Sequence, residues 1–208
     1  MLDVKAREPL QWILVPVARV FVRLGVSPGV LTATGFLGMI TGAILIARGH
    51  LLSGVWLSAA GAILDVIDGS VARESGKASE RGALLDTVTD RLGEIALFCG
   101  IGFYMAENGQ PRAAALTVLG IGFSLVIPFI RARAEAAGAE GKGGLMGRAE
   151  RLILVLVGLG LEGLGLQPFE LFLGVDLGIF EASLWLLVVM TGLTVLQRFR
   201  NTWVQLGA

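Results

Sequence analysis

Six apolar segments, each roughly 20 residues long, most constrain how this 208-residue chain can fold. They lie at about 29–49, 52–72, 83–105, 112–132, 149–167 and 178–198. A helix needs about 20 predominantly apolar residues to cross the hydrocarbon core of a bilayer. The chain is 54% hydrophobic and 16% charged, whereas about a quarter of the residues of a soluble domain are charged. The sequence predicts an all-α integral membrane protein, a single domain 1–208 with a bundle of six transmembrane helices at 29–200.

The N-terminal segment, residues 1–25, is predicted to form an amphipathic helix at the membrane interface. Trp12, Val20 and Leu24 contribute to an apolar side, and arginines such as Arg19 supply cations for anionic lipid headgroups. An ordinary helix packed against its own bundle is the alternative interpretation.

Charge is balanced overall but is unevenly distributed along the chain. The formal net charge is zero, which gives no basic field of the kind that binds nucleic acid. If the N-terminus is cytosolic, all of the 17 lysines and arginines except Arg48 and Arg112 fall in or beside cytosolic segments. The positive-inside rule therefore places both termini on the cytoplasmic side of a multi-pass protein of the plasma membrane.

Four aspartates stand beside or inside the second and third apolar segments: Asp65, Asp68, Asp86 and Asp90. A carboxylate in a spanning helix is costly and usually marks a functional site. The first two are three residues apart and the last two are four apart, so each pair shares one face of a helix. Two antiparallel helices joined by a short loop would bring both pairs together at the cytosolic end.

Divalent metal is the expected partner of these carboxylates. The chain has one histidine and one cysteine, too few for a nitrogen or sulfur cage. Oxygen ligands alone suit Mg²⁺ or Mn²⁺, with room for two ions. Small residues and one cation lie between the two pairs and would let a phosphate approach the helix backbone: Gly69, Ala72, Arg73 and Gly82.

The pattern D-x2-D-G-x2-A-R-x8-G-x3-D-x3-D at residues 65–90 resembles the signature of the CDP-alcohol phosphotransferase family. The resemblance implies a membrane enzyme, usually a homodimer, that transfers a phosphatidyl group from CDP-diacylglycerol to an alcohol and releases CMP. It implies that Asp65, Asp68 and Asp86 hold the metals, and that Asp90 completes the site and acts as general base. It also implies a set of CDP-binding residues: Thr32, Asp65, Gly69, Ala72, Arg73, Ser79 and Gly82.

The acceptor is suggested by the stretch RARAEAAGAEGKGGLMGRAERLILVLVG and by similar stretches near both ends. They resemble the actinobacterial phosphatidylinositol-phosphate synthases of that family, which use inositol 1-phosphate. The resemblance implies that basic residues bind the acceptor phosphate: Arg131, Arg133, Arg151 and Arg198, with Arg148 nearby. Convergent arginines would also suit a dianionic phosphate on chemical grounds. Anchoring of the bundle at the inner surface is the alternative role for these residues.

Two departures from the family pattern affect the predicted binding residues. Gly29 follows Pro28 where the family tends to have Asn or Asp, which removes a side chain that could contact cytosine. Ala149 replaces a proline of the relatives. Ser79 is predicted to donate to the nucleotide, with a solvated loop residue as the alternative.

Three functions are compatible with the sequence. The first is phosphatidylinositol phosphate synthesis, and the second is the same chemistry with glycerol 3-phosphate. The third is a non-enzymatic cation transporter, which fits less well because its sites would lie near mid-membrane in broken helices. GLGLEG at residues 158–163 matches a dinucleotide-binding pattern but follows no strand, and is predicted to be helix-packing glycine.

Overall fold

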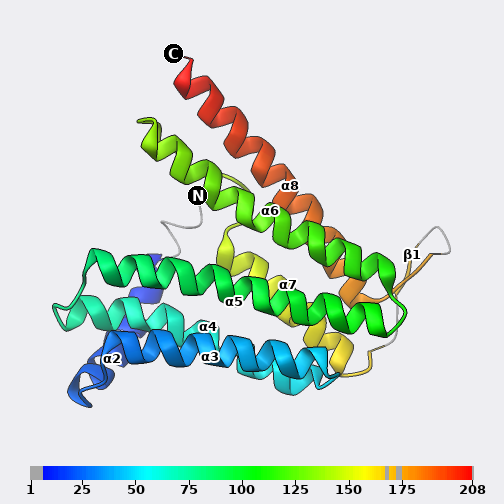
Figure 1. The fold of residues 1–208 in the computed structure, drawn as a ribbon, viewed down its shortest axis with the longest axis horizontal. Coiled ribbons are helices and arrows are strands. Elements are labelled where there is room, and N and C mark those ends of the chain that lie inside the picture. Colours follow the sequence, from blue (N-terminus) through cyan, green and yellow to red (C-terminus); the bar gives the residue numbers. More distant parts are fainter. Residues whose placement is uncertain (1–6, 167–168, 172–174, 208) are drawn as a thin grey trace. The chain divides into compact units, whose positions relative to one another are not determined.

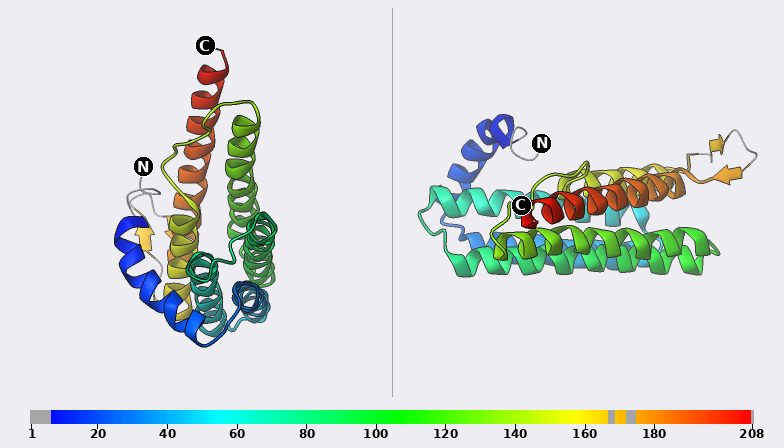
Figure 2. Two further views of the ribbon diagram at one scale, coloured as in Figure 1. Left: turned by 90° about the vertical axis from the view of Figure 1, so that its left-hand side faces the viewer. Right: turned by 90° about the horizontal axis from the view of Figure 1, so that it is seen from above.

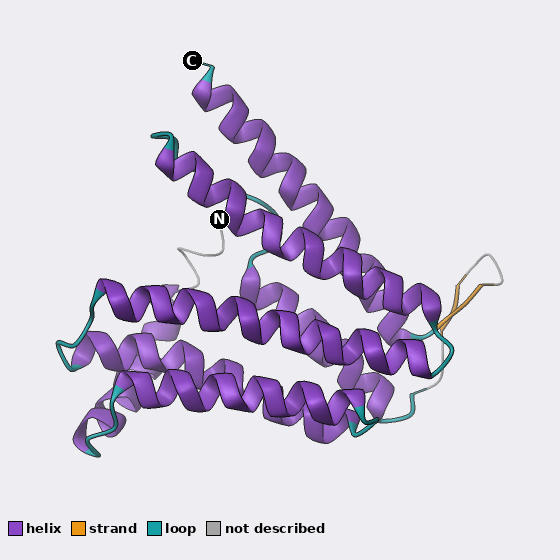
Figure 3. Cartoon of the chain, in the orientation of Figure 1, coloured by secondary structure: helices purple, strands orange, loops and turns teal. Residues whose placement is uncertain are grey.

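The structure is a computed structural model that describes residues 7–166, 169–171 and 175–207. The described residues form seven helices and one pair of short strands (Figures 1 and 3). They cluster into two compact units, Met1–Gly100 and Ile101–Ala208. The expectation of a single membrane domain stays a prediction, and each unit is described by itself. Two parts of the predictions lie outside the described residues: residues 1–6 of the predicted interfacial helix, and residue 167, the predicted end of the fifth segment.

A helix occupies each of the six predicted segments. Their bounds are α3 Pro28–Ala47, α4 Leu51–Glu74, α5 Glu80–Glu107, α6 Pro111–Ala136, α7 Arg148–Gly163 and α8 Ile179–Leu206. Within the described part of the chain, α3, α4, α6 and α8 are long and apolar enough to cross a membrane. The other two helices do not meet these requirements: α7 has only 16 residues, and α5 carries charged side chains throughout its first half. The prediction of helical, membrane-spanning architecture is confirmed, while six spans stay a prediction.

Small residues bring α3 and α4 of the first unit into close contact. The two helices are antiparallel and are joined by a turn at 48–50 (Figure 1). A Cβ atom added to Gly35 would lie 2.8 Å from the carbonyl oxygen of Gly61, and one added to Gly54 would lie 2.7 Å from that of Gly42. These separations leave no room for a side chain, so the two backbones pack directly against each other.

Helix α3 also contacts the middle of α5, through residues next to those that face α4. A Cβ atom on Gly93 would meet the Met39 side chain at 3.4 Å, and Gly100 faces the backbone of Ala43. Helix α3 is therefore the central helix of the first unit, with α4 and the 80–100 part of α5 packed on it.

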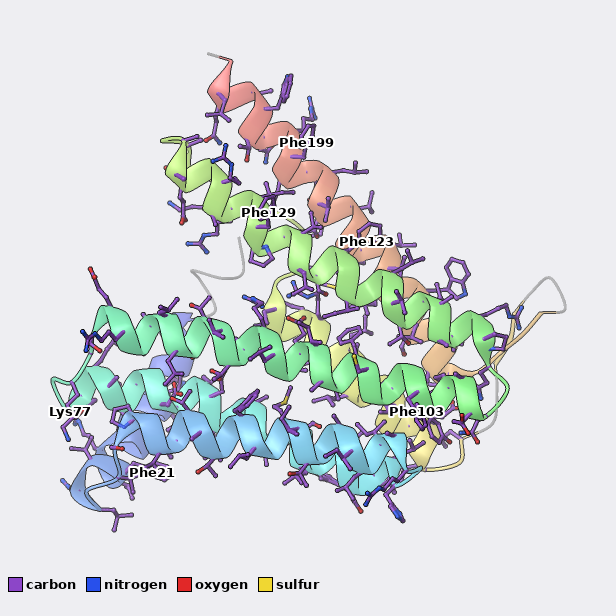
Figure 4. The ribbon with its side chains drawn as sticks, viewed as in Figure 1. Phe21, Lys77, Phe103, Phe123, Phe129 and Phe199 are labelled. Carbon is purple, nitrogen blue, oxygen red and sulfur yellow. The ribbon has the colours of Figure 1, made fainter. Side chains whose placement is uncertain are left out.

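An additional helix, α2 Arg7–Arg23, precedes α3 (Figure 2). Ala18 is fully buried in an apolar cluster with Ile67 and Val71 of α4, and Phe21, labelled in Figure 4, packs against that cluster. Trp12 remains largely exposed. One side of α2 thus packs on its own bundle, as in the alternative interpretation drawn from the sequence. Its position at a membrane interface stays a prediction.

In the second unit, α6 and α8 run side by side (Figure 4). The ring of Phe123 on α6 lies against Gly192 of α8. A Cβ atom on Gly158 of α7 would come within 3.2 Å of the Phe180 ring on α8. The prediction that this glycine of GLGLEG serves helix packing is confirmed.

The second unit also holds two strands that the sequence did not predict. They are β1 Phe169–Leu171 and β2 Val175–Leu177, which pair antiparallel with Phe169 opposite Leu177. They occupy the connection between α7 and α8, and the fold class remains helical apart from this pair.

Candidate metal and phosphate site

Three of the four predicted aspartates converge. Asp65 and Asp68 on α4 and Asp86 on α5 each offer one carboxylate oxygen, and these oxygens all lie within 4.8 Å of one another. Asp68 is only 3% exposed, and the other two are half-buried. Hard divalent cations such as Mg²⁺ and Mn²⁺ take carboxylate oxygens as ligands, so this donor set fits the predicted metal. We call these residues the aspartate trio.

The turn between α4 and α5 explains why the trio forms. Ser75 donates its hydroxyl to the carbonyl of Val71 at 2.7 Å. Gly76 adopts a φ of 66°, the left-handed conformation that commonly ends a helix. The amide of Gly82 then donates to Ser79 Oγ at 3.1 Å, which caps the start of α5. The tight reversal, with Lys77 in its loop (Figure 4), sets Asp86 against the acidic end of α4.

Asp90 lies on α5, one turn beyond Asp86, and is half-buried. It is not one of the three residues whose oxygens fall within 4.8 Å of one another. Its predicted double role as fourth ligand and general base stays a prediction. Its place on the same helix, four residues from a trio member, suits a base that acts beside a metal site.

Thr32 takes a position that the sequence did not predict. It lies in the first turns of α3, is 6% exposed, and donates its hydroxyl to Asp68 Oδ2. Sequence reasoning assigned Thr32 to the nucleotide only. No local pattern links the two residues, because they are 36 positions apart and meet only through the packing of α3 on α4.

Arg73 lies one turn beyond the trio on α4. Its Nη2 donates to Ser70 Oγ at 3.0 Å, and a Cβ atom at Gly69 would be 3.6 Å from its Nη1. The guanidinium group therefore lies back over Gly69, and the missing side chain leaves that surface open. A cation above bare helix backbone beside three carboxylates is suited to binding a metal-bound phosphate.

Two other predicted nucleotide residues have structural roles. Ser79 Oγ caps α5, and a Cβ atom on Gly82 would lie 3.2 Å from that oxygen. Glycine at 82 therefore leaves room for the cap. Ala72 is half-buried on α4. Nucleotide binding by these three residues stays a prediction.

Glu94 is an acidic residue that the sequence reasoning missed. It is 4% exposed on α5 and forms an ion pair with Arg91 at 3.1 Å. The available signal was its spacing, because Glu94 follows Asp90 by four residues and extends the row of acids along one helix face.

The five predicted acceptor-phosphate arginines belong to the second unit. Arg131 pairs with Glu135 at 2.8 Å and is half exposed, and Arg133 is exposed near the end of α6. Arg148 begins α7, and Arg151, one turn later, is only 2% exposed. A nearly buried arginine is uncommon unless it is paired. Anchoring at the membrane surface alone would not require such burial.

Arg198 on α8 supports the glycine-rich loop at 137–147. Its Nε donates to the Gly143 carbonyl at 2.7 Å, and its Nη1 donates to the Ile127 carbonyl of α6 at 3.3 Å. A Cβ atom on Gly141 would lie 2.9 Å from Cα of Arg131. The loop thus contacts both Arg131 and Arg198, and phosphate binding by the arginines stays a prediction.

A comparison with known sequences defines the class of protein. Residues 25–196 match the CDP-alcohol phosphatidyltransferase family, and this range includes the aspartate trio. The chain therefore belongs to the CDP-alcohol phosphatidyltransferase family.

Individual relatives are similar over nearly the whole chain. Phosphatidylinositol phosphate synthase of Mycobacterium tuberculosis is 36% identical over 205 residues, which cover 98% of this chain and 91% of the relative. The protein of the same name from Corynebacterium glutamicum is 38% identical over 202 residues, covering 95% and 87%.

Solved structures of the Mycobacterium tuberculosis synthase share this fold. The structure with CDP-DAG bound superposes with a TM-score of 0.78 at 35% identity and covers 92% of this chain and 94% of its own. The structure in complex with manganese and citrate also gives a TM-score of 0.78, at 34% identity, and covers 91% and 88%.

Proposed function

We propose that this protein transfers a phosphatidyl group from CDP-diacylglycerol to inositol 1-phosphate, giving phosphatidylinositol phosphate and CMP. The observation that carries the proposal is the aspartate trio, which sits in the family signature with its three oxygens within 4.8 Å. The near full-length similarity to phosphatidylinositol phosphate synthases supports this acceptor.

The trio and Arg73 would hold the donor. Asp65, Asp68 and Asp86 provide oxygens for Mg²⁺ or Mn²⁺, and two ions would suit a pyrophosphate substrate. Such ions, when bound, neutralise pyrophosphate charge and stabilise CMP as the leaving group. Arg73, lying over Gly69, would bind a phosphate oxygen through its guanidinium group.

Asp90 would act on the acceptor. The hydroxyl oxygen of the acceptor forms a new bond to the phosphorus that carries diacylglycerol, and the bond from that phosphorus to CMP breaks. The hydroxyl proton passes to the carboxylate of Asp90, which acts as general base. Because Asp90 follows Asp86 by one turn of the same rigid helix, the base is fixed relative to the trio.

The acceptor phosphate requires cations, and we assign this role to Arg131, Arg133, Arg148, Arg151 and Arg198. Guanidinium groups bind a dianionic phosphate through two parallel hydrogen bonds. The near-complete burial of Arg151 and the contact of Arg198 with the loop carbonyl support preorganised roles for these two.

The placement in the membrane is also a proposal. We assign six transmembrane spans to the chain. We assign the active site and both termini to the cytoplasmic side of the plasma membrane, and we expect the protein to form a homodimer. The uneven distribution of lysine and arginine supports the orientation. The exposed Trp12 of α2 supports contact of this helix with the membrane interface.

The test is CMP release from CDP-diacylglycerol by the purified protein, with four acceptors offered separately: inositol 1-phosphate, inositol, glycerol 3-phosphate and serine. We expect rapid release only with inositol 1-phosphate. Faster release with glycerol 3-phosphate would replace the proposed acceptor by the alternative drawn from the sequence. No CMP release with any acceptor would contradict the proposal that the protein is a phosphatidyltransferase.

A further inference from the structure

The hydroxyl group of Thr32 makes a hydrogen bond that the proposed reaction does not account for. It belongs to a buried side chain on α3 and donates to Asp68 Oδ2 on α4. We propose that Thr32 is a positioning residue that holds Asp68 in its metal-binding orientation, a role separate from any contact of Thr32 with the nucleotide. This inference rests on the metal site of the proposed function.

The packing of α3 on α4 explains how so short a side chain reaches Asp68. Two glycine pairs set the register of these antiparallel helices: Gly35 with Gly61, and Gly42 with Gly54. The pairs are seven residues apart on both helices, so one further step of seven sets Pro28 opposite Asp68. The hydroxyl of Thr32 points back one turn, 3.1 Å from the Pro28 carbonyl oxygen, and thus reaches the level of Asp68.

The single proton of the hydroxyl has two acceptors within reach. A hydroxyl group donates one hydrogen, and the neighbours of Thr32 Oγ1 are the Pro28 carbonyl oxygen and Asp68 Oδ2. An ionised carboxylate is the stronger acceptor because the hydrogen bond is charge-assisted. The Pro28 carbonyl loses nothing, since the amide four residues later bonds it in the helix. The proton is therefore available to Asp68.

This hydrogen bond restricts the carboxylate. With Oδ2 bonded to α3, the Asp68 side chain cannot rotate freely, and the oxygens of the trio remain within 4.8 Å of one another. The partners that hydrogen-bond to metal ligands fix ligand orientation, and their loss typically weakens metal binding about 10- to 100-fold. The oxygen of the Thr32 hydroxyl keeps lone pairs that can still accept a hydrogen bond from a nucleotide.

The test measures Mn²⁺ binding to the purified full chain by electron paramagnetic resonance, with no nucleotide present. Thr32→Val keeps the size of the side chain and removes the hydroxyl, so the Mn²⁺ dissociation constant should rise about tenfold or more. Thr32→Ser keeps the hydroxyl and should bind Mn²⁺ within about threefold of wild type. Thr34→Val is the matched control, because Thr34 is exposed on the same helix, and should equal wild type.

A second readout separates the two roles of Thr32. The KM of Thr32→Val for CDP-diacylglycerol, measured at saturating Mn²⁺, reports the nucleotide contact separately. Unchanged Mn²⁺ binding in Thr32→Val would overturn the inference, and a raised KM in that variant would then show that Thr32 serves the nucleotide alone. Equal loss of Mn²⁺ binding in Thr32→Ser and Thr32→Val would also overturn it. Absence of Mn²⁺ binding in the wild-type protein would instead contradict the metal site itself.

Discussion

The acidic and the basic halves of the proposed chemistry are built in different ways. The aspartate trio comes from two consecutive helices joined by a turn of five residues, 75–79, whose hydrogen bonds are local. The predicted phosphate-binding arginines come from three helices of the second unit, separated by the loop at 137–147 and by the strand pair. The trio therefore depends on short-range geometry, whereas the arginines depend on long-range packing.

This difference predicts which property of the protein each substitution should change. A change within the trio should affect the chemistry and leave the fold intact, because these carboxylates crowd together without a structural need for one another. A change at a buried or loop-binding arginine should affect packing as well as binding. Exposed arginines therefore test the acceptor role most cleanly.

The largest effect is expected at the trio. Asp68→Asn or Asp86→Asn should lower CMP release by more than about a thousandfold, since the loss of a charged ligand weakens metal binding and the electrostatic stabilisation of the leaving group. The measurement is CMP release at saturating substrates, with folding checked by size-exclusion chromatography. Full turnover in both variants would contradict the metal assignment.

The next effect is expected at Asp90. Asp90→Asn should reduce transfer about a hundredfold to ten-thousandfold, the usual contribution of a general base, while CDP-diacylglycerol binding persists. Binding of the donor is measured by isothermal titration in the presence of Mn²⁺. Loss of donor binding equal to that of Asp68→Asn would make Asp90 chiefly a metal ligand.

Arg133, an exposed arginine, provides the sharpest test of the predicted acceptor-phosphate site. Arg133→Ala should raise the KM for inositol 1-phosphate about tenfold to a hundredfold, because a charged hydrogen bond contributes about 1.5–3 kcal/mol. The KM for CDP-diacylglycerol should stay nearly unchanged. Steady-state CMP release with each substrate varied in turn measures both constants.

Arg112→Ala is the matched control, because Arg112 is an exposed arginine at the opposite end of the same helix. Its ion pair with Glu181 at 3.5 Å is largely exposed on the arginine side and should contribute little stability. Identical behaviour of the two variants would refute a phosphate-binding role for Arg133. Arg151→Ala and Arg198→Ala should raise the same KM and also lower thermal stability, because Arg151 is buried and Arg198 holds the loop.

The smallest effect tests the helix packing that supports the trio. A Cβ atom on Gly42 would lie 2.8 Å from the Gly54 carbonyl oxygen, so Gly42→Ala should destabilise the protein by about 1–3 kcal/mol through overpacking. Gly122→Ala is the control, because a Cβ atom there has no neighbour within 4 Å. Thermal unfolding in detergent compares them, and equal midpoints would contradict the close approach of α3 and α4.

Local patterns in the sequence were enough to predict the helices and the trio. Apolar length located all six segments, and the spacing of Asp65, Asp68 and Asp86 required only helical periodicity and a short turn. The helix ends were less predictable: α6 continues to Ala136 through the stretch RARAEA, in which charged residues alternate with alanine. Arginine, glutamate and alanine favour helix, but hydropathy stops at the edge of the apolar segment.

Long-range contacts could not be predicted. The bond from Thr32 to Asp68 depends on a glycine register between two helices, and the contact of Arg198 with the Gly143 carbonyl spans 55 positions. The strand pair β1–β2 lies in a connection with no apolar alternation long enough to identify. Local spacing was therefore enough to predict the metal chemistry. The contacts that hold the site residues in place could be found only in the structure.

The most direct test of the central claim is the identity of the lipid product. Purified protein is incubated with CDP-diacylglycerol, inositol 1-phosphate and Mn²⁺, and both CMP and lipid are quantified by mass spectrometry, with an EDTA-treated sample in parallel. We predict phosphatidylinositol phosphate and CMP in equal amounts, with neither formed when EDTA removes the metal. CMP released without this lipid, or the lipid formed equally well in EDTA, would contradict the account.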